Sequence, residues 1–248
     1  PVPGNILVLD DNAYFASGRS SYIDGGMFLY KLDVSSGEVL AKKRLYDRDP
    51  ATGIEPINNA KNRYLSPAVL PDILSFDGMF ISIRHEQFDV NLARIAEEDK
   101  MPHVLSAVGF ADDSWWQRTS QMYTTAAGTG FGWDMPNSAV PSGRVIALDG
   151  DNVLGFGRTL PYSPFDNFAG LNLKRYHIFS MPRKPVVKRT QYETVDWGER
   201  IQERTQNVAV HTWSRDVAVR ARALLVAGDK MVLAGPKNVL HGIKPRAI

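Results

Sequence analysis

Three basic residues follow similar short apolar segments of this chain at corresponding places. Arg19 and Arg158 each come directly after a glycine, and Arg84 is followed by His85. If the segments superpose, these side chains gather at equivalent ends of their sheets. A group of guanidinium ions binds an anionic sugar, a sulfate or a carboxylate through paired hydrogen bonds. The alternative is that each arginine pairs with a neighbouring acid or with a backbone carbonyl.

One loop holds the densest group of side chains that could do chemistry. Its candidate binding residues are Asp112, Asp113, Trp115, Trp116 and Arg118. Adjacent carboxylates bind a hard cation such as calcium or share a proton, and flat indole faces suit sugar rings, aromatic ligands or quinones. The alternative is that the two acids form a turn and that the two tryptophans pack between sheets.

Other motifs give less direction. Trp133 and Asp134 form a second, smaller candidate group. No two of the five histidines have metal-ligand spacing, so we expect no histidine metal site. The GTGFG segment at 128–132 lacks the lysine and the helix of a phosphate loop. The chain has no cysteine, which excludes disulfides, thiolate zinc sites and cysteine nucleophiles.

The composition is that of a globular protein. The 248 residues are 44% hydrophobic and 23% charged, with a formal net charge of +2. The basic run at 183–189 has no wider basic face beside it, so we expect no nucleic-acid partner. No apolar run reaches the roughly 18 residues of a membrane-spanning helix. The chain begins at Pro1 without an initiator methionine, and we expect it to be part of a longer polypeptide.

Four segments share one pattern, an apolar run, an Asp, Gly or Asn turn, and a second apolar run. They are residues 6–17, 73–83, 145–156 and 224–234. Such turns supply the positive φ angles of tight β-hairpins. The turns recur about every 70 residues, longer than the roughly 40 to 50 of a propeller blade, so each unit would be a blade with inserted loops. The predicted fold is all-β, a partial β-propeller of about four long-looped, four-stranded antiparallel blades, with approximate units 1–66, 67–142, 143–205 and 206–248.

Further strands are expected around these hairpins. Residues 27–46 alternate well enough for two strands joined at 33–37, which completes a four-stranded sheet. Residues 88–92 resemble residues 32–37 weakly and predict the end of an equivalent strand. Residues 91–100 are also compatible with a short helix. We expect a strand around 173–181 and an outer strand in the VAVHTWSRDV segment.

The strand end at 32–40 resembles the pyrroloquinoline-quinone (PQQ)-type propeller repeat. In that repeat an apolar strand ends in Leu-Asp, and a two-residue gap precedes Thr/Ser-Gly and a second apolar strand. Leu32, Asp33, Ser36 and Gly37 match, and Ala41 stands where the repeat often has tryptophan. The resemblance to quinoprotein-type propellers implies a periplasmic or secreted protein of seven or eight blades, with the remaining blades in the same polypeptide.

The resemblance leaves three functions open. Quinone-dependent dehydrogenases in this group use an Asp base, a calcium ion held by Glu and Asn or Asp, and in many cases a vicinal disulfide. The disulfide is impossible here and no matching calcium motif is visible. We therefore expect a non-catalytic propeller without a cofactor that binds a ligand, such as an anionic glycan, or a partner protein through rim loops. The alternatives are a dehydrogenase with PQQ and calcium, and a carbohydrate-active enzyme that uses Arg84, His85 and the 112–116 loop on anionic glycans.

Overall fold

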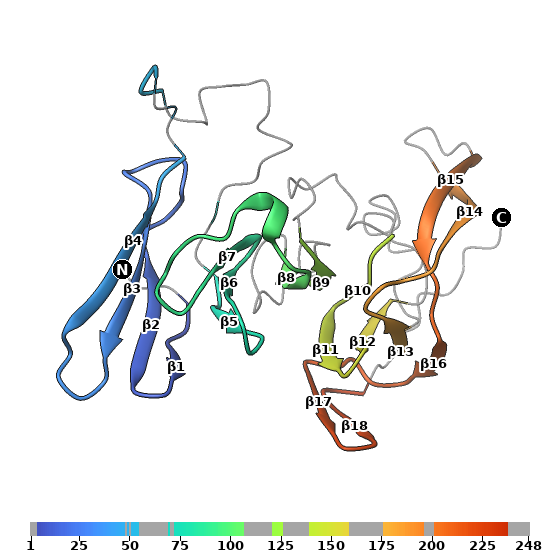
Figure 1. Cartoon of the computed structure of the whole chain (residues 1–248). Coiled ribbons are helices and arrows are strands. Elements are labelled where there is room, and N and C mark those ends of the chain that lie inside the picture. Colours follow the sequence, from blue (N-terminus) through green and yellow to red (C-terminus); the bar gives the residue numbers. More distant parts are fainter. Residues whose placement is uncertain are drawn as a thin grey trace. The chain divides into compact units, whose positions relative to one another are not determined.

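The structure is a computed structural model (Figure 1). It describes residues 4–47, 49, 51–54, 69, 72–106, 121–125, 139–158, 176–195 and 201–237. The chain forms two compact units: one comprises Pro1–Thr119 and Thr124–Asp134, and the other comprises Ser120–Tyr123 and Met135–Ile248. In the described ranges, no helix has the length and apolar character needed to cross a membrane.

The chain is all-β, with several small antiparallel sheets. The strands of the first unit are β1 (Leu7–Leu9), β2 (Asn12–Ser17), β3 (Met27–Asp33), β4 (Val39–Leu45), β5 (Ser75–Phe76), β6 (Ile81–Ile83), β7 (Glu86–Phe88) and β8 (His103–Ser106). The remaining strands are β9 (Gln121–Thr124), β10 (Ser142–Gly143), β11 (Val145–Asp149), β12 (Asn152–Arg158), β13 (Tyr176–Pro182), β14 (Val187–Val195), β15 (Ile201–Ala209), β16 (Trp213–Val217), β17 (Ala223–Ala227) and β18 (Lys230–Ala234).

All four predicted hairpins are confirmed. They are the antiparallel pairs β1–β2, β5–β6, β11–β12 and β17–β18. Three of them close with two-residue loops whose first residue has a positive φ: Asp10 (50°), Gly150 (52°) and Gly228 (59°). The turn chemistry of the sequence therefore predicts the hairpins correctly.

The first sheet has the expected four strands, in the order β1-β2-β3-β4 (Figure 1). Asp33 ends β3, and its Oδ1 accepts hydrogen bonds from the backbone N–H groups of Ser35 and Ser36. Gly37 then takes a φ of 74°, which a residue with a side chain adopts only at a cost. This closed turn starts β4 in the reverse direction.

The second sheet, β5-β6-β7, ends in a shorter version of the same turn. Asp89 Oδ1 accepts hydrogen bonds from the N–H groups of Asn91 and Ala93. Leu92 occupies the left-handed position with a φ of 63°. The alternative helix over 91–100 does not form, since this stretch contains only a 3-10 turn at Glu97–Asp99 (η2).

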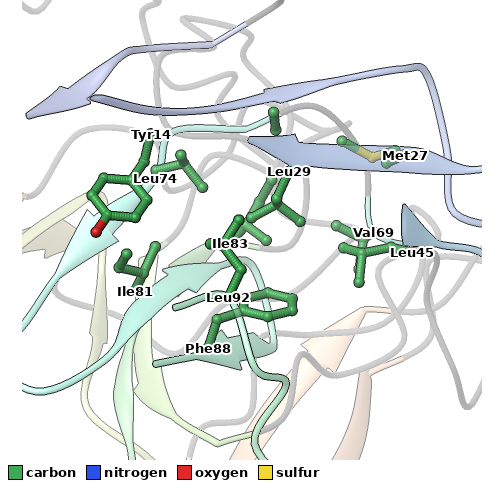
Figure 2. Close-up of a cluster of buried hydrophobic side chains, with 11 residues drawn as sticks. Tyr14, Met27, Leu29, Leu45, Val69, Leu74, Ile81, Ile83, Phe88 and Leu92 are labelled. Atoms are coloured by element: carbon green, nitrogen blue, oxygen red, sulfur yellow. The ribbon is translucent and has the colours of Figure 1, made fainter. Parts of the chain in front are cut away.

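The core of the first unit lies between these two sheets (Figure 2). Alternate residues of β2 and β3, including Tyr14 and Leu29, face Ile81, Ile83 and Phe88 of the second sheet. A cross-link reinforces this packing, because the Tyr14 hydroxyl donates a 2.9 Å hydrogen bond to the carbonyl of Val90. The period-two alternation thus gives the first sheet one face that is buried at its central strands β2 and β3 and partly buried at β1 and β4.

The second unit contains the sheet β11-β12-β13-β16 and the pairs β9–β10, β14–β15 and β17–β18. β13 lies close to the predicted strand around 173–181. β16 confirms the predicted outer strand, since it pairs only with β13 at the end of the sheet order. The long β14–β15 hairpin comes from a polar stretch for which the sequence analysis named no secondary structure.

Gly155 in β12 is directly opposite Phe179 in β13, and a side chain there would overlap the ring. Both ring Cε atoms lie 2.7 Å from the position of a Cβ at residue 155. We expect Gly155→Ala to lower the free energy of unfolding by about 1 to 3 kcal/mol through overpacking. Urea unfolding of a double-mutant cycle with Phe179→Leu checks this. An equal cost of Gly155→Ala in both backgrounds would contradict the clash.

Candidate functional site

The candidate site is built on the two-residue turn between β6 and β7, which consists of Arg84 and His85. Arg84 has a φ of 53°, the same left-handed conformation that Gly150 and Gly228 adopt in equivalent turns. A residue with a side chain pays roughly 1 to 3 kcal/mol for this conformation. An arginine at a position suited to glycine is therefore a local departure from the turn rules.

The Arg84 side chain is buried without hydrogen-bond partners for two of its nitrogens. The residue is 3% exposed, and Nε and Nη1 have no hydrogen-bond partner in the described part of the chain. Burial lowers the pKa of Arg84, and the negative charge of Asp72 offsets part of that effect. The backbone is held more firmly, because the ring Nε2 of His103 lies 2.5 Å from the Arg84 carbonyl oxygen.

His85 is a neutral imidazole beside this guanidinium. Its side chain is 17% exposed. Burial lowers the pKa of His85 from 6.5 to about 4, and the positive charges of Lys100 and Arg84 act in the same direction. Glu86 acts in the opposite direction but does not outweigh them. The ring Nδ1 has no hydrogen-bond partner within the described ranges. The imidazole therefore has a nitrogen available for a new hydrogen bond.

Glu86, in contrast, is fully engaged by cations. Its two carboxylate oxygens accept hydrogen bonds of 2.7 Å from Nε and Nη2 of Arg94. The Nζ of Lys100 lies 3.5 Å from the same carboxylate and 2.6 Å from Glu97. Burial alone would raise the pKa of Glu86, but the Arg94 hydrogen bonds and the Lys100 charge outweigh it and hold the pKa below its usual value.

These contacts leave the buried Asp72 as the acid whose charge acts on Arg84, while Arg84 Nε and Nη1 have no hydrogen-bond partner in the described residues. The Glu86 carboxylate already faces Arg94 and Lys100, so it does not neutralise Arg84. A buried ion without a good partner costs several kcal/mol. Strained backbone and unsatisfied buried polar groups are concentrated at functional sites. The arrangement can supply two guanidinium nitrogens as donors, and one imidazole nitrogen, to an anionic group.

The structure brings together two of the sequence-predicted residues, Arg84 and His85. Arg19 is exposed and pairs with Asp24, to which its Nε donates a 2.8 Å hydrogen bond. Arg19 therefore follows the alternative interpretation, in which the arginine pairs with a neighbouring acid. Arg158 ends β12 opposite Tyr176 in the other unit, and only its backbone is described. The loop candidates Asp112, Asp113, Trp115, Trp116 and Arg118, with Trp133 and Asp134, lie outside the described residues.

The sequence analysis missed the charged residues that surround the turn. Glu86 follows His85 directly, and the isolated β-bridge between Phe88 and Arg94 brings Arg94 back toward it. The strand β7 reads Glu-Gln-Phe, so no apolar pattern around Glu86 indicates that it is buried. The charged sequence around Lys100 predicts an exposed side chain. In the structure that side chain is only 2% exposed. No local pattern predicts that burial.

The described residues include no group of three or more His, Asp or Glu side chains that could hold a metal ion. Comparison with known protein families and with curated proteins found no match to the chain. The candidate site is therefore argued from its own geometry.

We expect Arg84→Gly to raise the free energy of unfolding by about 1 to 3 kcal/mol, because it removes a buried ion and suits the left-handed backbone. Chemical denaturation measures this change. Arg84→Asn, which is neutral and tolerates the same φ, separates the charge from the backbone effect. Arg19→Ala is the matched control and should change stability by less than about 0.5 kcal/mol. A clear loss of stability in both Arg84 variants would mean that the guanidinium makes favourable contacts.

The lowered pKa of His85 predicts acid sensitivity. Unfolded His85 binds a proton near its ordinary pKa of 6.5, whereas the folded residue does so only near pH 4. Between these values the unfolded state binds more protons, so stability falls as the pH falls. We expect His85→Gln to reduce this loss. Urea unfolding midpoints of the wild type and of His85→Gln at pH 7.5, 6.0 and 4.5 measure this loss. An equal fall of the midpoint with pH in the two proteins would contradict a buried neutral imidazole.

Proposed function

We propose that the chain is part of a β-propeller that works as a non-catalytic binding protein outside the cytoplasm. Its ligand or partner presents an anionic group, such as the carboxylate or sulfate of an acidic glycan, to the Arg84–His85 turn. The repeated hairpins and the four-stranded first sheet support the propeller. The observation that carries the binding proposal is the buried Arg84 guanidinium with two unpartnered nitrogens.

The free donors favour a ligand with several oxygen acceptors. Nε and Nη1 of Arg84 lie on different edges of the guanidinium, so each donates a separate hydrogen bond to an oxygen of the ligand. Glu86 does not compete for these donors, because Arg94 and Lys100 hold it. The Nδ1 of His85 adds a hydrogen bond to a hydroxyl or to the anion itself. The three groups together fit an acidic sugar better than a simple cation or an apolar molecule.

Binding requires the turn to open, since Arg84 is almost fully buried. The opening is confined to the two turn residues, because all six residues of β6 and β7 are buried and stay packed. The left-handed conformation of Arg84 already costs free energy in the closed form. The ligand selects an open form of the turn and accepts hydrogen bonds from the nitrogens that have no partner in the closed form.

A thermal-shift titration tests the proposal with sodium glucuronate and sodium sulfate as probes, and with sodium chloride at matched ionic strength. We expect the wild type and Arg19→Ala to gain melting temperature with the probes, because a ligand of the folded state stabilises it by mass action. Arg84→Gly should show no gain, although its melting temperature starts higher. An equal response of Arg84→Gly and wild type would overturn the proposal.

A carbohydrate-active enzyme that uses the same turn is the second candidate, and the Nδ1 of His85, which has no hydrogen-bond partner in the described residues, favours it by its place next to Arg84. A neutral imidazole accepts a proton, and a neighbouring guanidinium neutralises a sugar carboxylate. The two functions differ in outcome: incubation with a uronic acid polymer would generate new chain ends only if the turn is catalytic. His85→Gln would then abolish turnover, whereas binding without turnover supports the non-catalytic function.

A further inference from the structure

His103 contacts the Arg84–His85 turn and is almost fully buried. It is the first residue of β8 and is 2% exposed. Its ring Nε2 lies 2.5 Å from the carbonyl oxygen of Arg84, and its ring Nδ1 lies 3.1 Å from the carbonyl oxygen of Met101. Both ring nitrogens therefore face backbone oxygens, which can only accept a hydrogen bond.

Two carbonyl acceptors require a ring with two N–H donors. A neutral imidazole has one N–H donor, and its other nitrogen carries a lone pair. That lone pair would face the lone pairs of a carbonyl oxygen at a buried position, where an unmade hydrogen bond is costly. An imidazolium donates to both oxygens, and its hydrogen bonds are stronger than those of the neutral ring. The contacts of His103 thus fit the doubly protonated ring.

The second of these carbonyl groups belongs to a segment that is attached to β7. The N–H of Met101 donates a 2.8 Å hydrogen bond to Oε1 of Gln87, a fully buried residue of β7. The carbonyl oxygen of Gln87 accepts a 2.9 Å hydrogen bond from the N–H of Ile95. The segment is thus fixed to β7 both before and after η2. Turning the Met101 carbonyl away from His103 would disturb this attachment.

The charged side chains around the turn carry no surplus of positive charge that would oppose an imidazolium. The cations are Arg84, Arg94 and Lys100, and the acids that pair with them or act on them are Asp47, Asp72, Glu86 and Glu97. His85 adds no charge at pH 6.0 and above, because its pKa is lowered to about 4. Three cations against four acids leave one negative charge, which a protonated His103 balances.

We propose that His103 holds the Arg84–His85 turn closed as an imidazolium, and that the loss of one ring proton releases the turn for the anion. The inference rests on the proposed function and adds the regulation of its site, which opens more readily as the pH rises. His103 is a positioning residue, because it acts on the ligand only through the backbone of Arg84.

Either neutral tautomer of His103 weakens the hold on the turn. The Arg84 carbonyl belongs to the two residues that move when the guanidinium is uncovered, so opening breaks its contact with the ring. If Nε2 loses the proton, the hydrogen bond to Arg84 is gone. If Nδ1 loses the proton, the bond to Arg84 remains but comes from a neutral ring and is weaker.

NMR of the histidine side chains in nitrogen-15-labelled protein tests the protonation state. At pH 6.0 we expect two slowly exchanging ring N–H signals that are absent from His103→Gln, whose amide does not titrate. His211→Gln removes a half-buried histidine of the second unit and, as the matched control, should keep both signals. A single ring N–H signal from His103 at pH 6.0 would overturn the proposal. His103→Asn replaces His103→Gln if that variant does not fold.

The release of the turn is measured without a ligand, as the rate at which diethyl pyrocarbonate modifies His85. Mass spectrometry assigns the modified residue. The His85 side chain is only 17% exposed, so the reaction requires the turn to open. Because the lowered pKa keeps His85 neutral in the closed form, its own protonation does not change the rate between pH 6.0 and 8.5. The dependence of the rate on pH therefore reports on His103, with His103→Gln as the reference.

We expect the rate at His85 to rise about tenfold more in the wild type than in His103→Gln between pH 6.0 and 8.5. This factor corresponds to about 1.4 kcal/mol, close to the contribution of one hydrogen bond to a charged group. His211→Gln should behave like the wild type. Equal rises in the wild type and in His103→Gln would overturn the proposal. No anion is present in these measurements, so a failed glucuronate titration counts against the proposed function alone.

Discussion

The first unit depends on the apolar contact between the inner face of β1–β4 and the sheet β5–β7. The second sheet has strands of only two or three residues, too short to be stable without a partner. Ile81, Ile83 and Phe88 are fully buried in that contact. Each such side chain contributes about 1.5 to 3 kcal/mol when it is removed from water. The turn that carries Arg84 and His85 is therefore held in place by the packing of the strands on either side of it.

This packing explains how the chain tolerates an unfavourable turn. The strand pairing fixes a two-residue connection between β6 and β7, so its first residue must take a positive φ. Arginine accepts that conformation only because the buried strands leave no other geometry, and its guanidinium then lies in a region where Glu86 is already engaged. Functional sites commonly carry such costs, which a more stable sequence would remove.

Local rules predicted much of the fold and less of the site. Asp, Gly or Asn residues at the turns predicted the four hairpins, and the Asp33 motif predicted the turn after β3, because both depend on neighbouring residues. The β14–β15 hairpin was missed because its strands are polar and its described side chains are mostly exposed, so no apolar alternation reveals them. Arg84 and His85 were predicted as a pair, but the burial of Arg84 and the engagement of Glu86 by Arg94 and Lys100 depend on long-range contacts that a single sequence does not show.

The central claim is that the Arg84 guanidinium is held for an anion. A crystal structure of the protein grown with sodium selenate tests it directly, because selenium gives an anomalous signal that marks the ion without ambiguity. The account predicts a selenium peak that places selenate oxygens within hydrogen-bond reach of Arg84 Nε or Nη1, with Glu86 still bound to Arg94. A guanidinium whose nitrogens are satisfied by carbonyl or carboxylate oxygens of the protein, with no selenium peak beside it, would contradict the account.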